Sequence, residues 1–243
     1  MNGNVVSFTQ FRIGYQQSYI MNRNSLISII FGLCCCNTCM AQSLSDRIKS
    51  QGFVNIHDVD SSIHVSLMYT RPDNFTGKVL YTTLKEAYLH PDAAIALKKA
   101  QAKLKQLHPE YSLIIFDATR PMSVQQKMWN VVKGTSKNIY VSNPANGGGL
   151  HNYGFAVDIS ICDAKGDTIP MGTKVDFMGL ASQPKFENEM LSKKVITTES
   201  VRNRQLLRTV MAEGGFKVLN TEWWHFNLKT RAQVKAEKLR PLM

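Results

Sequence analysis

Hydrophobic and polar positions along this chain follow two periods, which together predict helices and short strands. The clearest helical pattern runs from Pro91 to Leu107, where apolar residues recur every three to four positions and lysines occupy the other face. The apolar positions are Ala93, Leu97, Ala100, Leu104 and Leu107. Proline and the following aspartate suit a first turn, and Pro109 lies just beyond the end. We therefore expect one long amphipathic helix here.

Other segments carry helical signals. Ser123-Val-Gln-Gln126 has the spacing of a capping box, in which two side chains satisfy free backbone amides, and Gly134 offers a stop. Residues 198–213 predict a further helix that ends at Gly214-Gly215. A short opening helix over 43–52 completes the predicted helical part of the chain.

Short apolar runs rich in β-branched and aromatic residues are typical of strands. The run 112–116 predicts a buried strand that delivers Asp117-Ala-Thr-Arg120-Pro121 at its carboxyl end. The remaining predicted strands cover 63–69, 156–161, 216–219 and 223–228, the last two as a hairpin, with polar loops over 71–77 and 135–150. Strands and helices segregate rather than alternate strictly, which favours an α+β fold: a single domain with a small antiparallel sheet and flanking helices.

The beginning of the chain has the composition of an export signal. A basic residue precedes the apolar run 25–33, and small residues follow it, as in a signal peptide. The run is too short for a spanning helix, which needs about 20 residues. We expect residues 1–20 to be an upstream extension, 21–41 a signal peptide, and 42–243 an exported, periplasmic domain. Lipoprotein anchoring through Cys34 is a weaker interpretation, because the residue before it is larger than such sites usually allow.

Composition and charge favour some classes of protein over others. Four of the five cysteines lie in the first 41 residues, so Cys162 has no intramolecular disulfide partner in the predicted exported domain. The net charge of +11 becomes +9 without the two arginines of that segment. Lysines and arginines are scattered, with no arginine-rich run and no aromatic stripe. A solvated basic face suited to the anionic cell envelope is therefore favoured over nucleic-acid binding. The oligomeric state is not fixed by the sequence.

The candidate chemistry lies in two short segments, His151-Asn-Tyr-Gly-Phe-Ala-Val-Asp158 and Glu222-Trp-Trp-His225. Together they hold two imidazoles, one aspartate and one glutamate. A catalytic zinc site uses three N/O ligands, an open position for water and one unligated carboxylate to take a proton. Gly154 allows a tight backbone between the loop histidine and the strand aspartate. The segments predict a divalent-metal site of the zinc type, and such a donor set binds several metals.

Each piece alone also has a structural interpretation. A lone His-x6-Asp pair is more often a surface histidine and a hydrogen-bonded acid, and 223–225 alone is typical of aromatic core packing. Arg120 at the end of a strand can stabilise an oxyanion or form a structural salt bridge. Because residues i and i+3 of a strand face opposite sides, Glu222 and His225 can address one metal only if Glu222 lies before the strand, in the turn at 220–221.

In combination the pieces are specific. The order Asp-Ala-Thr-Arg-Pro, His-x2-Gly-x-Ala-x-Asp and Glu-x2-His resembles the D-alanyl-D-alanine dipeptidases, the vancomycin-resistance dipeptidase group of zinc D,D-peptidases. The resemblance spans about Val59 to Leu228. It includes Tyr69 with Asn74-Phe-Thr-Gly77, then 171–178, then 203–207 and 214–216. These segments favour the dipeptidase branch over the carboxypeptidases of the same fold, and the resemblance implies a hedgehog/zinc D,D-peptidase-like fold over 42–243.

The resemblance also implies a role for each matching residue. The implied ligands of one Zn²⁺ per chain are His151, Asp158 and His225. Glu222 would act as general base and then as general acid, and Arg120 would steady the scissile carbonyl and its oxyanion. Tyr69 and Asp176 match positions that receive the free amino end of a dipeptide. The implied reaction is zinc-dependent hydrolysis of D-Ala-D-Ala, or a closely similar cell-wall dipeptide, to free amino acids.

One position departs from the family pattern. The family commonly has a serine two residues before the first zinc histidine, near the substrate carboxylate, where this chain has Gly149. The backbone N–H groups of Gly148 and Gly149 are the substitutes that the sequence offers.

Two alternatives stay open. One is a zinc D,D-carboxypeptidase or endopeptidase acting on longer muropeptides, which an open groove beyond the amino end would favour. The other is a non-catalytic zinc-containing binding module. Glu222 and Arg120 argue against that module, because neither is needed to hold a metal.

Overall fold

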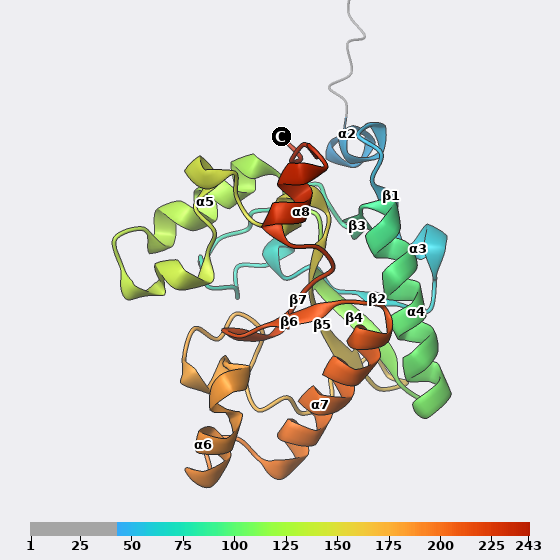
Figure 1. Cartoon of the computed structure of the whole chain (residues 1–243), viewed down its shortest axis with the longest axis vertical. Helices are drawn as coiled ribbons and strands as arrows, with labels where there is room; N and C mark the ends of the chain where they lie inside the picture. The colour runs from blue at the N-terminus through green and yellow to red at the C-terminus, as the bar shows by residue number, and fades with distance from the viewer. Residues whose placement is uncertain (1–42) are drawn as a thin grey trace, which may run out of the picture. The chain divides into compact units, whose positions relative to one another are not determined.

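The computed structural model of the protein describes residues 43–243 (Figure 1). The predicted extension and signal peptide, 1–41, lie outside the described residues. Within 43–243, none of the helices has the length and apolar character that crossing a membrane demands.

A five-stranded sheet with the order β2-β4-β5-β7-β6 forms the centre of the fold. Its strands are β2 (His64–Val65), β4 (Ser112–Asp117), β5 (Ala156–Cys162), β6 (Lys217–Leu219) and β7 (Glu222–Asn227). Neighbouring strands are antiparallel except β2 and β4, which run parallel at one edge. Every residue of the central strand β5 is buried. The predicted α+β fold with a small antiparallel sheet is confirmed, with one parallel pair added.

Two long helices pack against each other beside the sheet, α4 (Pro91–Leu107) and α7 (Thr198–Glu213) (Figure 1). The predicted apolar stripe of α4 is buried except at its last member, Leu107, which is 43% exposed. The end of α7 requires a glycine, because a Cβ at Gly214 would lie 2.3 Å from the carbonyl oxygen of Ala96. The spacing of apolar residues therefore predicted the buried face of α4 correctly, except in the last turn of the helix.

The remaining elements are shorter and surround this core. They are the helices α2 (Leu44–Ser50), α3 (Ile56–Val59), α5 (Met122–Val132), α6 (Glu187–Ser192) and α8 (Arg231–Ala236), and the antiparallel pair β1 (Val54–Asn55) and β3 (Tyr88–Leu89). Helices α3, α6 and α8 were not predicted. With four to six residues each, they are too short to show a helical period.

Two predictions about local structure were wrong. The segment 63–69 is a strand only at His64–Val65, and a 3-10 turn over Met68–Thr70 follows. Helix α5 begins at Met122 rather than after a capping Ser123, and no side chain caps it. The amide of Met122 instead donates to the carbonyl of Leu242, 2.8 Å away, so a distant part of the chain provides the acceptor.

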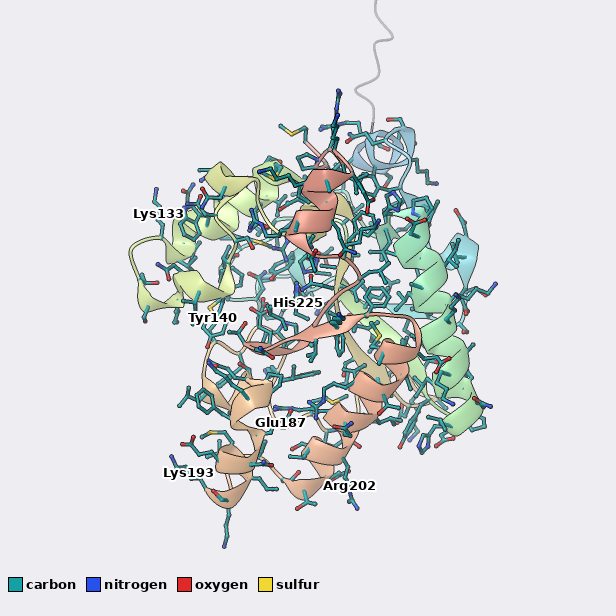
Figure 2. All side chains as sticks on the ribbon, viewed as in Figure 1. Lys133, Tyr140, Glu187, Lys193, Arg202 and His225 are labelled. Atoms are coloured by element: carbon teal, nitrogen blue, oxygen red, sulfur yellow. The ribbon has the colours of Figure 1, made fainter. Side chains whose placement is uncertain are left out.

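Arg204 of α7 provides a test of how the segment between β5 and α6 is held. The side chain is 1% exposed and donates to the carbonyls of Met171 (2.7 Å) and Ala181 (2.9 Å). We expect Arg204→Met to destabilise the protein by about 3 kcal/mol or more, because both buried carbonyls lose their donor. Urea unfolding measures this. Arg202→Met, on the exposed side of the same helix (Figure 2), is the matched control. Equal midpoints for the two variants would contradict the prediction.

Candidate active site

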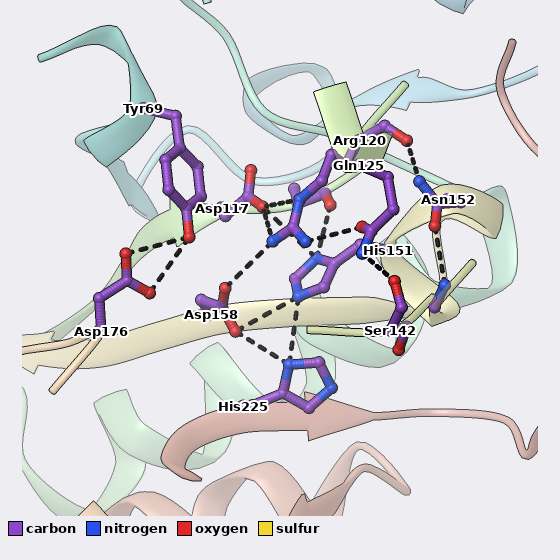
Figure 3. Close-up of polar contacts among 12 residues, drawn as sticks. Tyr69, Asp117, Arg120, Gln125, Ser142, His151, Asn152, Asp158, Asp176 and His225 are labelled. Atoms are coloured by element: carbon purple, nitrogen blue, oxygen red, sulfur yellow. Dashed lines mark hydrogen bonds and ion pairs between the residues drawn. The ribbon is translucent and has the colours of Figure 1, made fainter. Parts of the chain in front are cut away.

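Two histidines and one aspartate converge from neighbouring segments of the sheet (Figure 3). Asp158 lies within β5 and pairs in register with His225 of β7, and His151 lies in the turn just before β5. Asp158 Oδ1 is 3.0 Å from His225 Nδ1 and 3.3 Å from His151 Nε2. The two ring nitrogens are 3.1 Å apart. The structure thus brings the three predicted metal ligands together, with their ligand atoms within 4.8 Å of one another.

The hydrogen bonds of the two imidazoles fix which ring nitrogens face this cluster. His151 Nδ1 lies 2.7 Å from the carbonyl oxygen of Ala118 and must donate to it, which leaves Nε2 as an acceptor. His225 Nε2 lies 2.9 Å from Asn227 Oδ1, which leaves Nδ1 as an acceptor. When both imidazoles are neutral, two lone pairs and a carboxylate oxygen face one another, an arrangement that a cation stabilises. The donor set of two nitrogens and one oxygen fits a zinc-type ion.

Asp158 is ionised in this environment. Burial alone would raise the pKa of its carboxyl group, but the charges of protonated His151 and His225, and the hydrogen bonds that these rings then donate, outweigh burial and hold the pKa well below its usual range. A carboxylate must be deprotonated to bind a metal, so the site is prepared for one at neutral pH.

Gly154 shapes the backbone between the loop histidine and the strand. Its φ is +72°, and a Cβ there would lie 2.6 Å from Phe53 Cε1 and 2.7 Å from the backbone nitrogen of His90. Glycine is needed on both counts. The predicted tight turn between His151 and Asp158 is confirmed.

Glu222 is the first residue of β7, so the expectation that it precedes the strand was wrong. The pairing of β6 with β7 is irregular at this point, between Val218 and Leu219, and strict alternation does not hold. Glu222 Oε2 lies 3.8 Å from His225 Nδ1, so the carboxyl group reaches the metal cluster. Burial raises the pKa of Glu222 to about 8, although His225 acts to lower it. The site therefore contains a carboxyl group with raised basicity.

Arg120 is buried and held by two partners. Its Nε and Nη2 donate to Asp117 Oδ2 at 2.9 and 2.5 Å, and Nη1 donates to Gln125 Oε1 at 2.9 Å. The structural salt bridge is thus present, yet the side chain also lines the cavity beside the metal cluster. A guanidinium has five N–H groups, so two remain beyond these three bonds for a ligand. The structural and catalytic interpretations of Arg120 are compatible.

Tyr69 and Asp176 meet at one side of the cavity. The Tyr69 hydroxyl donates to the Asp176 carboxylate, with distances of 3.1 and 3.0 Å to its two oxygens. Asp176 has a φ of +64°, a left-handed conformation that is uncommon outside glycine and is often found at functional sites. Burial, and then the nearby Asp158, raises the pKa of Asp176 to about 7.

A cavity of about 530 Å³ connects these groups and reaches Gly149 on another side. The predicted use of backbone N–H groups there was wrong. The N–H of Gly149 donates to Asn152 Oδ1 at 2.8 Å, and that of Gly148 to the carbonyl of Asn143 at 3.3 Å. Both N–H groups are therefore already paired within the protein.

Sequence reasoning missed three residues that support the site. Asp117 accepts from Arg120 and also from the Tyr81 hydroxyl at 2.7 Å. Gln125 is fully buried and links Arg120 to the carbonyl of Ser142, to which its Nε2 donates at 2.7 Å. Asp117 stands in the motif that the sequence singled out and could have been assigned from it. Tyr81 and Gln125 carried no comparable signal.

The raised pKa of Asp176 predicts a dependence of stability on pH. The folded protein keeps this proton up to about pH 7, whereas an unfolded aspartate releases it near pH 4, so stability falls as pH rises through this window. We expect Asp176→Asn to lose less stability than the wild type from about pH 4 to pH 7, a difference of up to a few kcal/mol. Asparagine tolerates the left-handed backbone. Urea unfolding of chelated protein across the window measures this, and parallel curves would count against it.

Comparisons with known proteins agree on one family. A family model described as D-ala-D-ala dipeptidase matches residues 49–239. The chain is similar to D-alanyl-D-alanine dipeptidase of Escherichia coli (strain K12), with 31% identity over 179 residues that cover 74% of this chain and 86% of the relative. It is also similar to that of Enterococcus faecium, with 24% identity over 199 residues that cover 73% and 92%. The matched range contains every residue that forms the cluster described above.

Proposed function

We propose that this chain, which belongs to the D-ala-D-ala dipeptidase family, hydrolyses D-Ala-D-Ala, or a closely similar cell-wall dipeptide, with one Zn²⁺ per chain. The family makes the protein a peptidase, and therefore a hydrolase. The observation that carries the finer proposal is the convergence of three metal-ligand side chains with an unligated, buried Glu222 in one cavity. A cell-wall substrate agrees with the export predicted from residues 21–41, which stays a prediction.

The metal would be held by His151, Asp158 and His225. When bound, a zinc ion supplies Lewis-acid chemistry that acidifies water and polarises a carbonyl group. Glu222 Oε2 accepts the proton of the attacking water as the new C–O bond forms at the scissile carbonyl. The same carboxyl group then delivers that proton to the leaving nitrogen as the C–N bond breaks.

Arg120 stabilises the negative charge that develops on the carbonyl oxygen. Its bonds to Asp117 and Gln125 fix the plane of the guanidinium before substrate arrives, so little reorganisation is needed at the moment of reaction. Burial would lower the pKa of Arg120, but the charge of Asp117 and neighbouring groups holds it well above its usual value. The side chain therefore stays cationic throughout the reaction.

The Tyr69–Asp176 pair favours a dipeptide over a longer substrate. A free ammonium group would pair with the buried Asp176 carboxylate, whose side-chain hydrogen-bond partner among the described residues is the neutral Tyr69 hydroxyl. An acylated nitrogen, as in a longer muropeptide, brings no charge to this carboxylate and needs further space. The carboxypeptidase alternative is therefore less well supported than the dipeptidase.

Release of free D-alanine from D-Ala-D-Ala by the purified, zinc-loaded protein tests the proposal. We expect chelator-sensitive release from the free dipeptide, and release at least tenfold slower from N-acetyl-D-Ala-D-Ala, because the acetyl group removes the ammonium charge. Faster hydrolysis of the acetylated compound would favour the carboxypeptidase alternative. No hydrolysis of either by protein with one equivalent of bound zinc would contradict the proposal and favour the binding module.

A further inference from the structure

The cavity has two chemically different sides. The acidic residues that line it are Asp158, Asp176 and Glu222, and they lie at the metal cluster or beside Tyr69. The lining on the other side includes Ser142, Gly149 and Arg231 and contains no acidic residue among those described. In Figure 3, Ser142 and Asp176 lie on opposite sides of the His151–Asp158–His225 cluster. A bound molecule with a positive and a negative end has one favoured direction in such a cavity.

Arg231 supplies positive charge on the side without acids. Its Nη1 donates to the carbonyl of Gly148 at 2.8 Å, and its Nη2 donates to the carbonyl of Asn146. In the part of the chain that the structure describes, it forms no ion pair with a carboxylate, in contrast to Arg120 beside Asp117. Neutral carbonyls orient the guanidinium without cancelling its charge, so Arg231 attracts an anion to this side.

Ser142 places a hydroxyl group beside Gly149. A Cβ built on Gly149 would lie 2.9 Å from Ser142 Oγ and 3.2 Å from Ser142 Cβ. Gly149 has a φ of −112°, which any residue adopts, so the glycine is needed for space and not for its backbone. The carbonyl of Ser142 accepts from Gln125, whose other end accepts from Arg120. Gln125 thus fixes the position of Ser142 relative to Arg120, the arginine proposed to stabilise the carbonyl oxygen.

We propose that Ser142 Oγ and the Arg231 guanidinium bind the C-terminal carboxylate of the dipeptide. The inference rests on the proposed function, since the ammonium end directed to Asp176 leaves the carboxylate end for the opposite side. Ser142 donates its hydroxyl proton to one carboxylate oxygen, and Arg231 adds charge and further N–H donors. Gly149 contributes by leaving room for Ser142, because its own N–H is already used.

Hydrolysis of D-Ala-D-Ala and of its C-terminal amide by the zinc-loaded full chain tests this assignment. The amide keeps the scissile bond and the ammonium group, but it lacks the negative charge and has an NH2 donor in place of one acceptor oxygen. We expect Ser142→Ala and Arg231→Gln each to lower kcat/KM for the acid about 10- to 100-fold and to lower kcat/KM for the amide by less than about fivefold, because a hydrogen bond to a charged group is stronger than one to a neutral carbonyl. Ser136→Ala, an exposed serine of the same loop outside the cavity, is the matched control. Equal losses for acid and amide would show a merely structural role and overturn the proposal.

Gly149 and Ser142 are in contact, which allows a rescue experiment. Gly149→Ser alone should lower the preference for the acid, because its Cβ displaces the Ser142 hydroxyl. Combining it with Ser142→Gly should restore that preference, since the new hydroxyl enters the space that the old one leaves. A double variant no better than Ser142→Gly alone would count against the assignment.

A binding measurement distinguishes failure of the proposed carboxylate site from failure of the proposed hydrolysis. If the wild type hydrolyses neither compound, the proposed function fails, and calorimetric titration with D-Ala-D-Ala decides the inference. Tighter binding to the wild type than to Ser142→Ala would still support a carboxylate site. Equal binding, or none to either protein, would overturn it.

Discussion

Glu222→Gln should abolish hydrolysis of D-Ala-D-Ala while zinc stays bound. Glutamine keeps the size and one oxygen of the side chain but cannot accept a proton from water or return it to the leaving nitrogen. General acid and base catalysis contributes about 10²- to 10⁴-fold at each proton transfer, and both transfers depend on this one residue. We therefore expect kcat to fall by at least about 10³-fold, because the two transfers are lost together.

Metal content distinguishes loss of proton transfer in Glu222→Gln from loss of the metal site. Glu222 is not one of the three residues of the His151–Asp158–His225 cluster, so Glu222→Gln should bind one equivalent of zinc like the wild type. Elemental analysis after gel filtration measures this, and Glu213→Gln, at an exposed position near the end of α7, controls for the loss of an acid. Turnover above a tenth of the wild-type value would mean that another group moves the proton.

The parts of the fold that could be predicted from sequence are those in which the signal is local. Helix α4 has a regular stripe and a proline start, and α7 ends at two glycines, so both were located closely. The ligand segments could be recognised because their spacing is fixed by one loop and one hairpin. Asp158 and His225 are even direct partners across β5 and β7.

The parts that could not be predicted depend on contacts between distant segments. Helix α5 begins where the amide of Met122 meets Leu242, far away in the chain, so the local capping signal at Ser123 was misleading. The link from Arg120 through Gln125 to Ser142 joins a strand end, a helix and a loop, and no spacing rule encodes it. The role of Gly149 likewise depends on which side chain occupies the space beside it.

His225→Ala should remove both zinc and activity, in contrast to Glu222→Gln. Loss of this ring leaves one imidazole and one carboxylate, a set that is too small for the zinc sites found in proteins. We expect less than a tenth of an equivalent of zinc after gel filtration and no measurable release of D-alanine. His108→Ala controls for the loss of a histidine, because His108 lies on the surface beyond α4 and outside the cavity.

Thermal unfolding adds a readout that is independent of turnover. Zinc that binds only the folded state stabilises it by about 2.7 kcal/mol at a free concentration of 100 times Kd. The wild type and Glu222→Gln should therefore unfold at a higher temperature when zinc is added to chelated protein, and His225→Ala should not respond. A zinc-dependent increase in His225→Ala as large as in the wild type would place the metal elsewhere. It would also remove the basis for the proposed hydrolysis, because the role proposed for Glu222 requires a metal ion at the His151–Asp158–His225 cluster.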